Sequence, residues 1–343
     1  MPRTRLQLLT NPSFYWFAIS CFLTSLGAGI SYLALSWGVL QVHDAVAAVS
    51  MLMLSFWLPN VLLGPILGVF ADKHSRKWLI ICANGVRGTI LIFFGLLFRH
   101  YVTVHFVHLL MIMLGLAFSL YLPAAIALIR EIVQAEDLLY ANSINNIAYE
   151  LGFALGMGSA GFIVHLVAVP MTLFLVGIIF IISTLAMRRV KVITLNNVKK
   201  KSNPVHQDFK LGLKYLYQNK RLIIIYCVQL LLLVAFMTTP VLLAPFAKNV
   251  LHANASEFGG IEASLSGGII VGGLFMPWLA KRIGLYHCII LFCFLLGIFF
   301  IWFSLNRHII IADVIYFCLG IGLSVWPLIV TRAQQLNVLG NNR

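Results

Sequence analysis

The chain has 343 residues, of which 61% are hydrophobic and only 10% are charged, and its mean hydropathy is +0.97. This composition excludes a soluble domain of the same length and predicts an integral membrane protein. The formal net charge of +14 does not indicate nucleic-acid binding, because a basic nucleic-acid protein needs a soluble fold to present its patch.

Ten apolar segments are long enough to cross a membrane as helices, which requires about 20 residues each. They lie at roughly 14–40, 46–70, 78–98, 104–129, 142–167, 168–187, 221–247, 260–280, 285–305 and 309–331. Unbroken apolar runs such as Leu222 to Ala247 exclude a closed barrel, whose strands alternate apolar and polar residues. The sequence therefore predicts an all-α polytopic membrane protein with about ten transmembrane helices.

Positive charge gathers on one side of these predicted spans. With the amino terminus inside the cell, 20 of the 24 Lys and Arg residues fall in cytoplasmic segments, ten of them between Arg188 and Arg221. The outer loops hold only Arg99, Lys248 and Arg307. Because Lys and Arg are retained on the cytoplasmic side, both termini are expected to be cytoplasmic.

The loop after the second predicted span reads GVFADKHSRK, from Gly68 to Lys77. It resembles the loop between helices 2 and 3 of the major facilitator superfamily, whose pattern is roughly G-x-x-x-D-R-x-G-R-R/K. The resemblance implies a helical-bundle transporter of a bacterial inner membrane and a conformational gating motif. The motif consists of Gly68, Asp72, Lys73, Arg76, Lys77 and Arg130. The carboxylate of Asp72 suits Arg76 or Arg130 as a partner, and the alternative is that the cations only anchor the loop.

The basic segment 188–220 divides the chain. It separates an N-terminal six-helix bundle, 1–187, from a C-terminal four-helix partial bundle, 221–343. Within this cytoplasmic linker, Phe209, Leu213 and Leu216 fall on one face of a predicted interfacial helix. Superfamily members typically have twelve helices, so the resemblance implies that the last two are absent. Either ten helices suffice or the chain is a truncated product.

The predicted helix 142–167 carries the longest polar face in the chain. The face is formed by Asn142, Asn145, Asn146, Tyr149 and Glu150 at helical spacing. Glu150 is the only acidic residue placed deep within a predicted span, and Arg87 lies at a similar depth. Intramembrane charges usually pair or serve transport, so the two are expected to form an ion pair, or each to have a structural role, with Glu150 as the candidate for proton coupling. Small residues at Gly152, Gly156 and Ala160 predict close helix packing.

The order of segments from Asn11 to about Arg188 looks most like the drug-exporter branch, which includes macrolide-efflux and enterobactin-exporter proteins. Lysophospholipid and siderophore transporters of the same superfamily are the alternatives. In this superfamily helices 1, 4, 7 and 10 line the cavity. The candidate lining residues on helices 1, 7 and 10 are Ser20, Thr24, Tyr32, Ser36, Trp37, Gln229, Thr238, Thr239, Ser324 and Trp326. The polar face of the fifth predicted helix adds Asn145, Asn146 and Tyr149. This lining is aromatic and apolar, which favours an amphiphilic substrate.

These observations predict a secondary active transporter that exports a small amphiphilic or hydrophobic compound, coupled to protons, by alternating access. The expected partners are the lipid bilayer, the substrate and protons. No cofactor or metal is expected, because the six cysteines show neither CxxC nor Cys/His spacing. An enzyme is not expected, since no ATP-binding loop or intramembrane catalytic pair is found. A non-transporting remnant is the remaining alternative.

Overall fold

The computed structural model describes residues 8, 10–42, 46–97, 104–134, 137–192, 217 and 220–324, except for the side chains at some helical positions. The described part is almost entirely α-helical. The helices are α2 (Pro12–Val42), α3 (Val46–Lys73), α4 (Arg76–Leu97), α5 (Val104–Ile132), α6 (Leu138–Arg188), α8 (Lys220–Asn249), α9 (Ala255–Ile283), α10 (Leu285–Leu305) and α11 (Ile309–Leu323). The predicted linker, with its interfacial helix, falls largely outside the described residues.

Helix α6 is 51 residues long and contains a kink that turns it into two arms. Ala168 has φ 61° and ψ 168°, which is not a helical conformation, and Pro170 follows it. Proline lacks the N–H that a continuous helix would need at this point. The arms, residues 138–167 and 169–188, correspond to two of the predicted spans, whose boundary was placed between residues 167 and 168. The ten predicted segments therefore all have helical counterparts.

Six described helices are long and apolar enough to cross a membrane. They include α2, α4, α5, α9 and α10, and the kinked α6 is counted as one. Apolar helices of 10–17 residues lie within α3 and at α11. The all-α prediction is confirmed.

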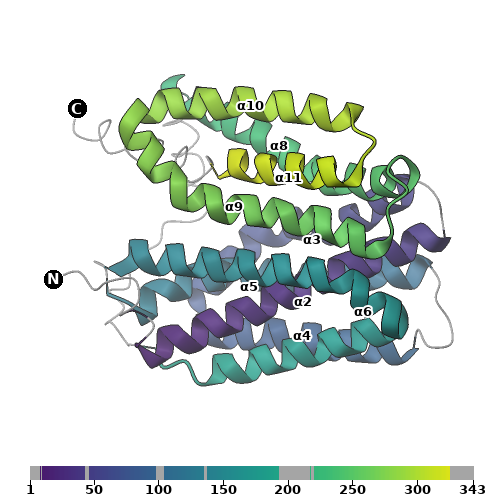
Figure 1. Ribbon diagram of the computed structural model, residues 1–343. Helices are drawn as coiled ribbons and strands as arrows, with labels where there is room; N and C mark the ends of the chain where they lie inside the picture. The colour runs from purple at the N-terminus through teal and green to yellow at the C-terminus, as the bar shows by residue number, and fades with distance from the viewer. Residues whose placement is uncertain are drawn as a thin grey trace.

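The helices form two groups, one of α2 to α6 and one of α8 to α11 (Figure 1). In the first group α2 and α4 pack on α6, and α3 packs on α5; in the second, α11 packs on α9 and α10. The groups meet mainly where α6 contacts α9, and also where α3 contacts α8. We call the end at which α2 and α4 begin the basic face, since Arg76, Lys77, Arg188 and Arg189 lie there, and the other end the opposite face.

A buried hydroxyl and amide network holds α2, α4 and α6 together. The Oγ of Ser183 lies 2.9 Å from the Oγ of Ser20 and 2.9 Å from the Oγ1 of Thr24. Asn84 donates from Nδ2 to Thr24 at 2.8 Å and to Ser183 at 3.1 Å. All four residues are buried. Ser20 and Thr24 are therefore packing residues, and the prediction that they line the cavity is wrong.

Glycines allow α6 to approach α2 closely. A Cβ atom at Gly152 would lie 2.4 Å from the carbonyl oxygen of Phe22, and one at Gly156 would lie 2.4 Å from that of Leu26. Since real Cβ atoms do not come so near to backbone, only glycine fits at both positions. The predicted small-residue packing face is confirmed.

Candidate functional site

The two groups of helices meet along a seam at which α9 packs against α6 and α2. A Cβ at Gly161 of α6 would lie 2.4 Å from the carbonyl oxygen of Ala255, at the start of α9. A Cβ at Gly259 would lie 2.4 Å from the carbonyl oxygen of Met157. These contacts lie toward the opposite face, because α9 begins there and the first arm of α6 ends there. The seam is therefore closed by backbone contact at that end.

Aromatic and polar contacts join the halves near the same end. Trp37 of α2 stacks on Phe258 of α9, with ring centroids 6.0 Å apart. The ammonium of Lys248 in α8 donates to the carbonyl oxygen of Leu40 at 2.6 Å. Trp37, a predicted cavity residue, thus belongs to the closed end of the seam.

Glu150 lies on the seam at mid-depth. It is half-buried and lies close to Ser266 of α9. Because Glu150 is twelve residues from the start of α6, it lies about 18 Å from that end at 1.5 Å per residue. The hydrocarbon core is about 30 Å thick, so this carboxyl group lies well within it.

A second carboxyl group, that of Glu262, lies one helical turn from Ser266 on the same face of α9. It is 3% exposed, and Tyr32 of α2 donates from its hydroxyl to Oε1 at 3.4 Å. The buried Tyr316 of α11 lies beside it. Glu262 and Ser266 are four residues apart, so the carboxyl groups of Glu262 and Glu150 differ in depth by about 6 Å.

Sequence reasoning missed Glu262, which is only two residues from residue 260, where the predicted span begins. The helix begins earlier, at Ala255, where Asn254 and Glu257 form a capping box. The capping pattern Asn-x-x-Glu was the available signal for this earlier start. The expectation that Glu150 is the only deep acidic residue is therefore wrong.

Arg87 is enclosed by aromatic rings. Its guanidinium carbon lies 5.0 Å from the ring centroid of Tyr121, 5.2 Å from that of Phe118 and 5.5 Å from that of Phe180. The residue is 4% exposed, and its Nη2 has no hydrogen-bond partner. Cation–π attraction of this kind partly replaces the lost hydration of the cation.

The expected ion pair between Arg87 and Glu150 is not formed, although the structure describes both side chains. The physical reason is the direction in which each residue faces. Helix α4 packs on α5 and α6, so Arg87 points into the first group of helices, whereas Glu150 faces Ser266 of α9. Tyr149, adjacent to Glu150, is the member of the polar face that lies near Arg87.

The rest of the predicted polar face is divided between environments. Asn146 is exposed, whereas Asn145 is half-buried with a buried Oδ1 that has no hydrogen-bond partner. Tyr149 is half-buried. The side chain of Gln229 and the whole of Trp326 lie outside the described residues.

The loop between α3 and α4 contacts the ends of two other helices at the basic face. Arg76 forms an ion pair with Glu131 at the end of α5. Lys77 donates to the carbonyl oxygen of Arg188 at 2.8 Å, at the end of α6. Arg130, the expected partner residue on α5, is exposed. The adjacent Glu131 was missed by sequence reasoning, although an acidic residue beside Arg130 was a visible signal.

The remaining motif residues, Gly68, Asp72 and Lys73, lie in α3 at positions where the structure describes the helix but not the side chains. Their roles stay predictions. Among the described residues, no group of three or more His, Cys, Asp and Glu side chains is placed to hold a metal ion.

The Major Facilitator Superfamily family model matches residues 17–337, which is most of the chain. This match identifies the two groups of helices and the seam between them as those of a membrane transporter. The chain belongs to the major facilitator superfamily. The expected superfamily is confirmed. A search of curated proteins found no match.

Solved structures with the same fold include transporters with different cargo. A variant of the nucleoside transporter NupG gives a TM-score of 0.71 at 17% identity, over 91% of this chain and 80% of that one. A bacterial homologue of the iron transporter ferroportin, in an inward-facing state, gives 0.66 at 17% identity, over 97% and 85%. A bacterial homologue of the lysosomal transporter Spinster, inward-facing and unoccupied, gives 0.64 at 14% identity, over 92% and 73%. At these identities the likeness shows the fold alone.

Proposed function

We propose that the protein is a secondary active transporter that exports a small amphiphilic or hydrophobic compound in exchange for protons, by alternating access. The observation that carries the proposal is the pair of carboxyl groups, Glu150 and Glu262, one helical turn apart in depth at the seam between the halves. The substrate class rests on the aromatic and apolar character of the predicted cavity lining, which includes Tyr32 beside Glu262. The resemblance to the drug-exporter branch points the same way.

The partners of the two carboxyl groups suit a protonation cycle. In the described part of the chain neither group has a cationic partner; Glu150 faces the hydroxyl of Ser266 and Glu262 that of Tyr32. A hydroxyl donates to an ionised carboxylate and accepts from a protonated one. Either group can therefore gain or lose a proton without breaking an ion pair. Ionisable residues within the membrane are expensive and mark transport pathways, which favours a coupling role.

The proposed orientation places the basic face on the cytoplasmic side of a bacterial inner membrane, because Lys and Arg are retained on that side. The backbone contacts of Gly161 and Gly259 then close the seam toward the outside. In this orientation both termini are cytoplasmic. Reporter domains fused after Asn197 and at the carboxyl terminus test it, since both should give cytoplasmic signals, and a periplasmic signal from either would reverse it.

The coupling role is tested with the variants Glu150→Gln and Glu262→Gln. Inverted membrane vesicles with an imposed proton gradient are supplied with amphiphilic dyes, antibiotics and a labelled lysophospholipid. We expect wild-type vesicles to concentrate at least one of these compounds, and both variants to lose uphill accumulation while retaining substrate exchange. The matched control is Glu257→Gln, on the same helix, because glutamine still completes the capping box with Asn254.

The outcomes separate the alternatives. Accumulation of the lysophospholipid alone would favour the lysophospholipid transporter, and a labelled siderophore tests its counterpart in the same way. If wild-type vesicles concentrate none of the compounds and show no exchange, the account of a non-transporting remnant is favoured. If both Gln variants still concentrate a substrate, the two carboxyl groups are structural.

A further inference from the structure

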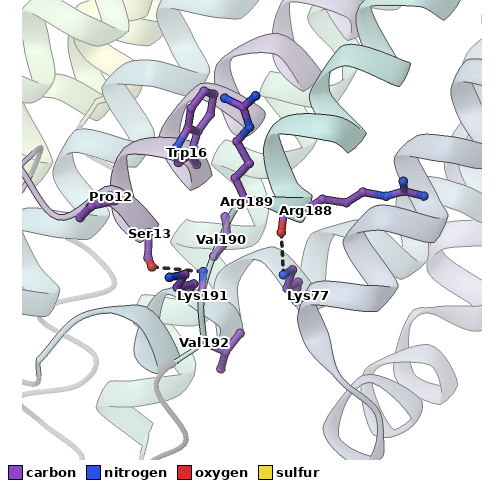
Figure 2. A pocket seen from close by; sticks show the side chains of 9 residues that line it. All are labelled: Pro12, Ser13, Trp16, Lys77, Arg188, Arg189, Val190, Lys191 and Val192. Carbon is purple, nitrogen blue, oxygen red and sulfur yellow. Dashed lines mark hydrogen bonds between the residues drawn. The ribbon is translucent and has the colours of Figure 1, made fainter.

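A groove on the basic face gathers cationic side chains from the ends of three helices. It has a volume of about 780 Å³ and lies between the start of α2, the start of α4 and the end of α6. Its lining residues are Pro12, Ser13, Trp16, Lys77, Arg188, Arg189, Val190, Lys191 and Val192. Four of them carry positive charge and none is acidic. Figure 2 shows this groove and all nine residues.

The groove is built from defined contacts that join these helix ends. The ammonium of Lys77 donates to the carbonyl oxygen of Arg188 at 2.8 Å, which joins α4 to the end of α6. The backbone N–H of Lys191 donates to the Oγ of Ser13 at 3.1 Å, which joins the chain after α6 to the start of α2 (Figure 2). The guanidinium of Arg189 lies 4.4 Å from the ring centroid of Trp16. These contacts fix the backbone around the groove and the position of one arginine.

The four cations have no acidic partner among the residues that the structure describes. The ion pair found there, Arg76 with Glu131, lies on α4 and α5 and involves none of them. Arg188, Arg189 and Lys191 are exposed, and Lys77 is half-buried. A cluster of cations without counter-ions favours an anion that several of them can contact at once. Arginine supplies paired donors in the geometry of a phosphate.

The surroundings of the groove favour a lipid as the source of that anion. The groove lies at the ends of spanning helices, which in the proposed orientation is the depth of the headgroups on the cytoplasmic side. Tyr15 and Trp78, which adjoin lining residues in the sequence, are exposed. Ile182 and Leu185 are exposed on α6, one to two turns before its end at the basic face. Aromatic residues gather at membrane interfaces, and exposed aliphatic side chains on a spanning helix face acyl chains. Basic pockets between transmembrane helices on this side recognise anionic headgroups.

We propose that this groove binds the phosphodiester headgroup of an anionic membrane lipid. In the proposed complex Lys77 and Lys191 contact the phosphate, and the exposed side chain of Arg188, which points away from Arg189 in Figure 2, turns toward it. Trp16 holds Arg189 at the edge of the groove. The acyl chains lie along the exposed aliphatic face of α6. The bound lipid joins the starts of α2 and α4 to the end of α6.

The test is native mass spectrometry of the purified full-length protein with dioleoyl phosphatidylglycerol, with dioleoyl phosphatidylcholine, and with inorganic phosphate. Each cation near the surface contributes about fivefold to the binding of an anionic lipid, so Arg188→Gln with Arg189→Gln should weaken phosphatidylglycerol binding by about 25-fold. Lys191→Gln alone should weaken it about fivefold. This single change leaves the backbone contact with Ser13 in place, and it serves if the double variant does not fold.

The matched control is Arg282→Gln, because the guanidinium of Arg282 also lies 4.4 Å from a tryptophan ring centroid, that of Trp278 at the end of α9. This variant should bind phosphatidylglycerol within twofold of wild type. Arg189→Lys keeps the charge and should retain most of the binding. Preference for phosphatidylglycerol over phosphatidylcholine, lost in the groove variants alone, supports the proposal.

Two results would overturn the proposal. If inorganic phosphate competes fully with phosphatidylglycerol at equal concentration, the groove is a site for a soluble anion and not for a lipid. If the groove variants and Arg282→Gln lose phosphatidylglycerol binding equally, the binding reflects the general positive charge of this face and no defined site exists.

Discussion

Gly161 is the position at which the closed seam is most sensitive to one added methyl group. The Cβ of an alanine there would lie 2.4 Å from the carbonyl oxygen of Ala255 and 2.5 Å from the Cα of Ser256. Ordinary contact begins at 3.4 Å, so α6 and α9 must separate locally by about 1 Å. The atoms in the way belong to the backbone and cannot turn aside. Gly161→Ala is therefore expected to disfavour the conformation closed at the opposite face.

The size of the effect follows from the cost of overpacking a tight contact, about 1–3 kcal/mol. If the open conformation does not bear this cost, the ratio of closed to open molecules falls by about 5- to 150-fold. Spin labels at His165 and Arg307, both exposed near the opposite face, report the separation of the halves in a cysteine-free background. We expect the distribution of label distances to shift to longer values in Gly161→Ala.

Gly158 provides the matched control on the same arm of α6. A Cβ there would lie 3.6 Å from the Cβ of Ala263, which is ordinary contact, so Gly158→Ala should keep the wild-type distance distribution. A wild-type distribution in Gly161→Ala, with the protein folded and monodisperse, would refute the reasoning that this contact closes the seam.

Three further predictions concern the basic face and the first group of helices. Asp72→Asn is expected to reduce transport while leaving substrate affinity within a few-fold, measured by transport and binding assays on one preparation; normal transport would make the motif a topology anchor. Arg76→Gln and Glu131→Gln should each slow transport, and the double variant should be no slower than either single variant. Additive losses of transport rate would show that their ion pair is not the relevant contact. Ser183→Ala should lower the free energy of unfolding by about 1–2 kcal/mol because it removes buried hydrogen bonds, and Ser159→Ala, whose hydroxyl bonds only to its own helix, should leave thermal unfolding unchanged.

The helical layout could be predicted from the sequence because hydropathy and length determine which segments can cross a membrane. The break at Ala168 was placed correctly for the same reason, since residues 142–187 are too long for one span. Helix starts were less accurate. The capping box at Asn254 adds turns before the apolar core of α9, so Glu262, which was not among the expected site residues, lies about two turns inside the helix and is buried.

The pairing of charges could not be predicted, because a sequence gives the depth of a residue but not the neighbour that its helix face meets. Arg87 and Glu150 were expected at similar depth, yet one faces a cluster of aromatic rings and the other faces α9. The groove was also hidden in the sequence, since Pro12, Lys77 and Lys191 are brought together only by the packing of three helix ends. The positive charge of that region was correctly recognised, but only as a signal of orientation.

The central claim, that protons drive transport through this chain, is tested most directly in proteoliposomes that contain only the purified protein. A pH gradient is imposed, the internal concentration of an amphiphilic dye is followed, and a protonophore is then added. We expect wild-type protein to accumulate dye above the external concentration, and this accumulation to collapse with the protonophore. Accumulation should be missing in Glu150→Gln, which still exchanges dye at equilibrium. Accumulation that persists in Glu150→Gln and in Glu262→Gln, or that ignores the protonophore, would contradict the claim.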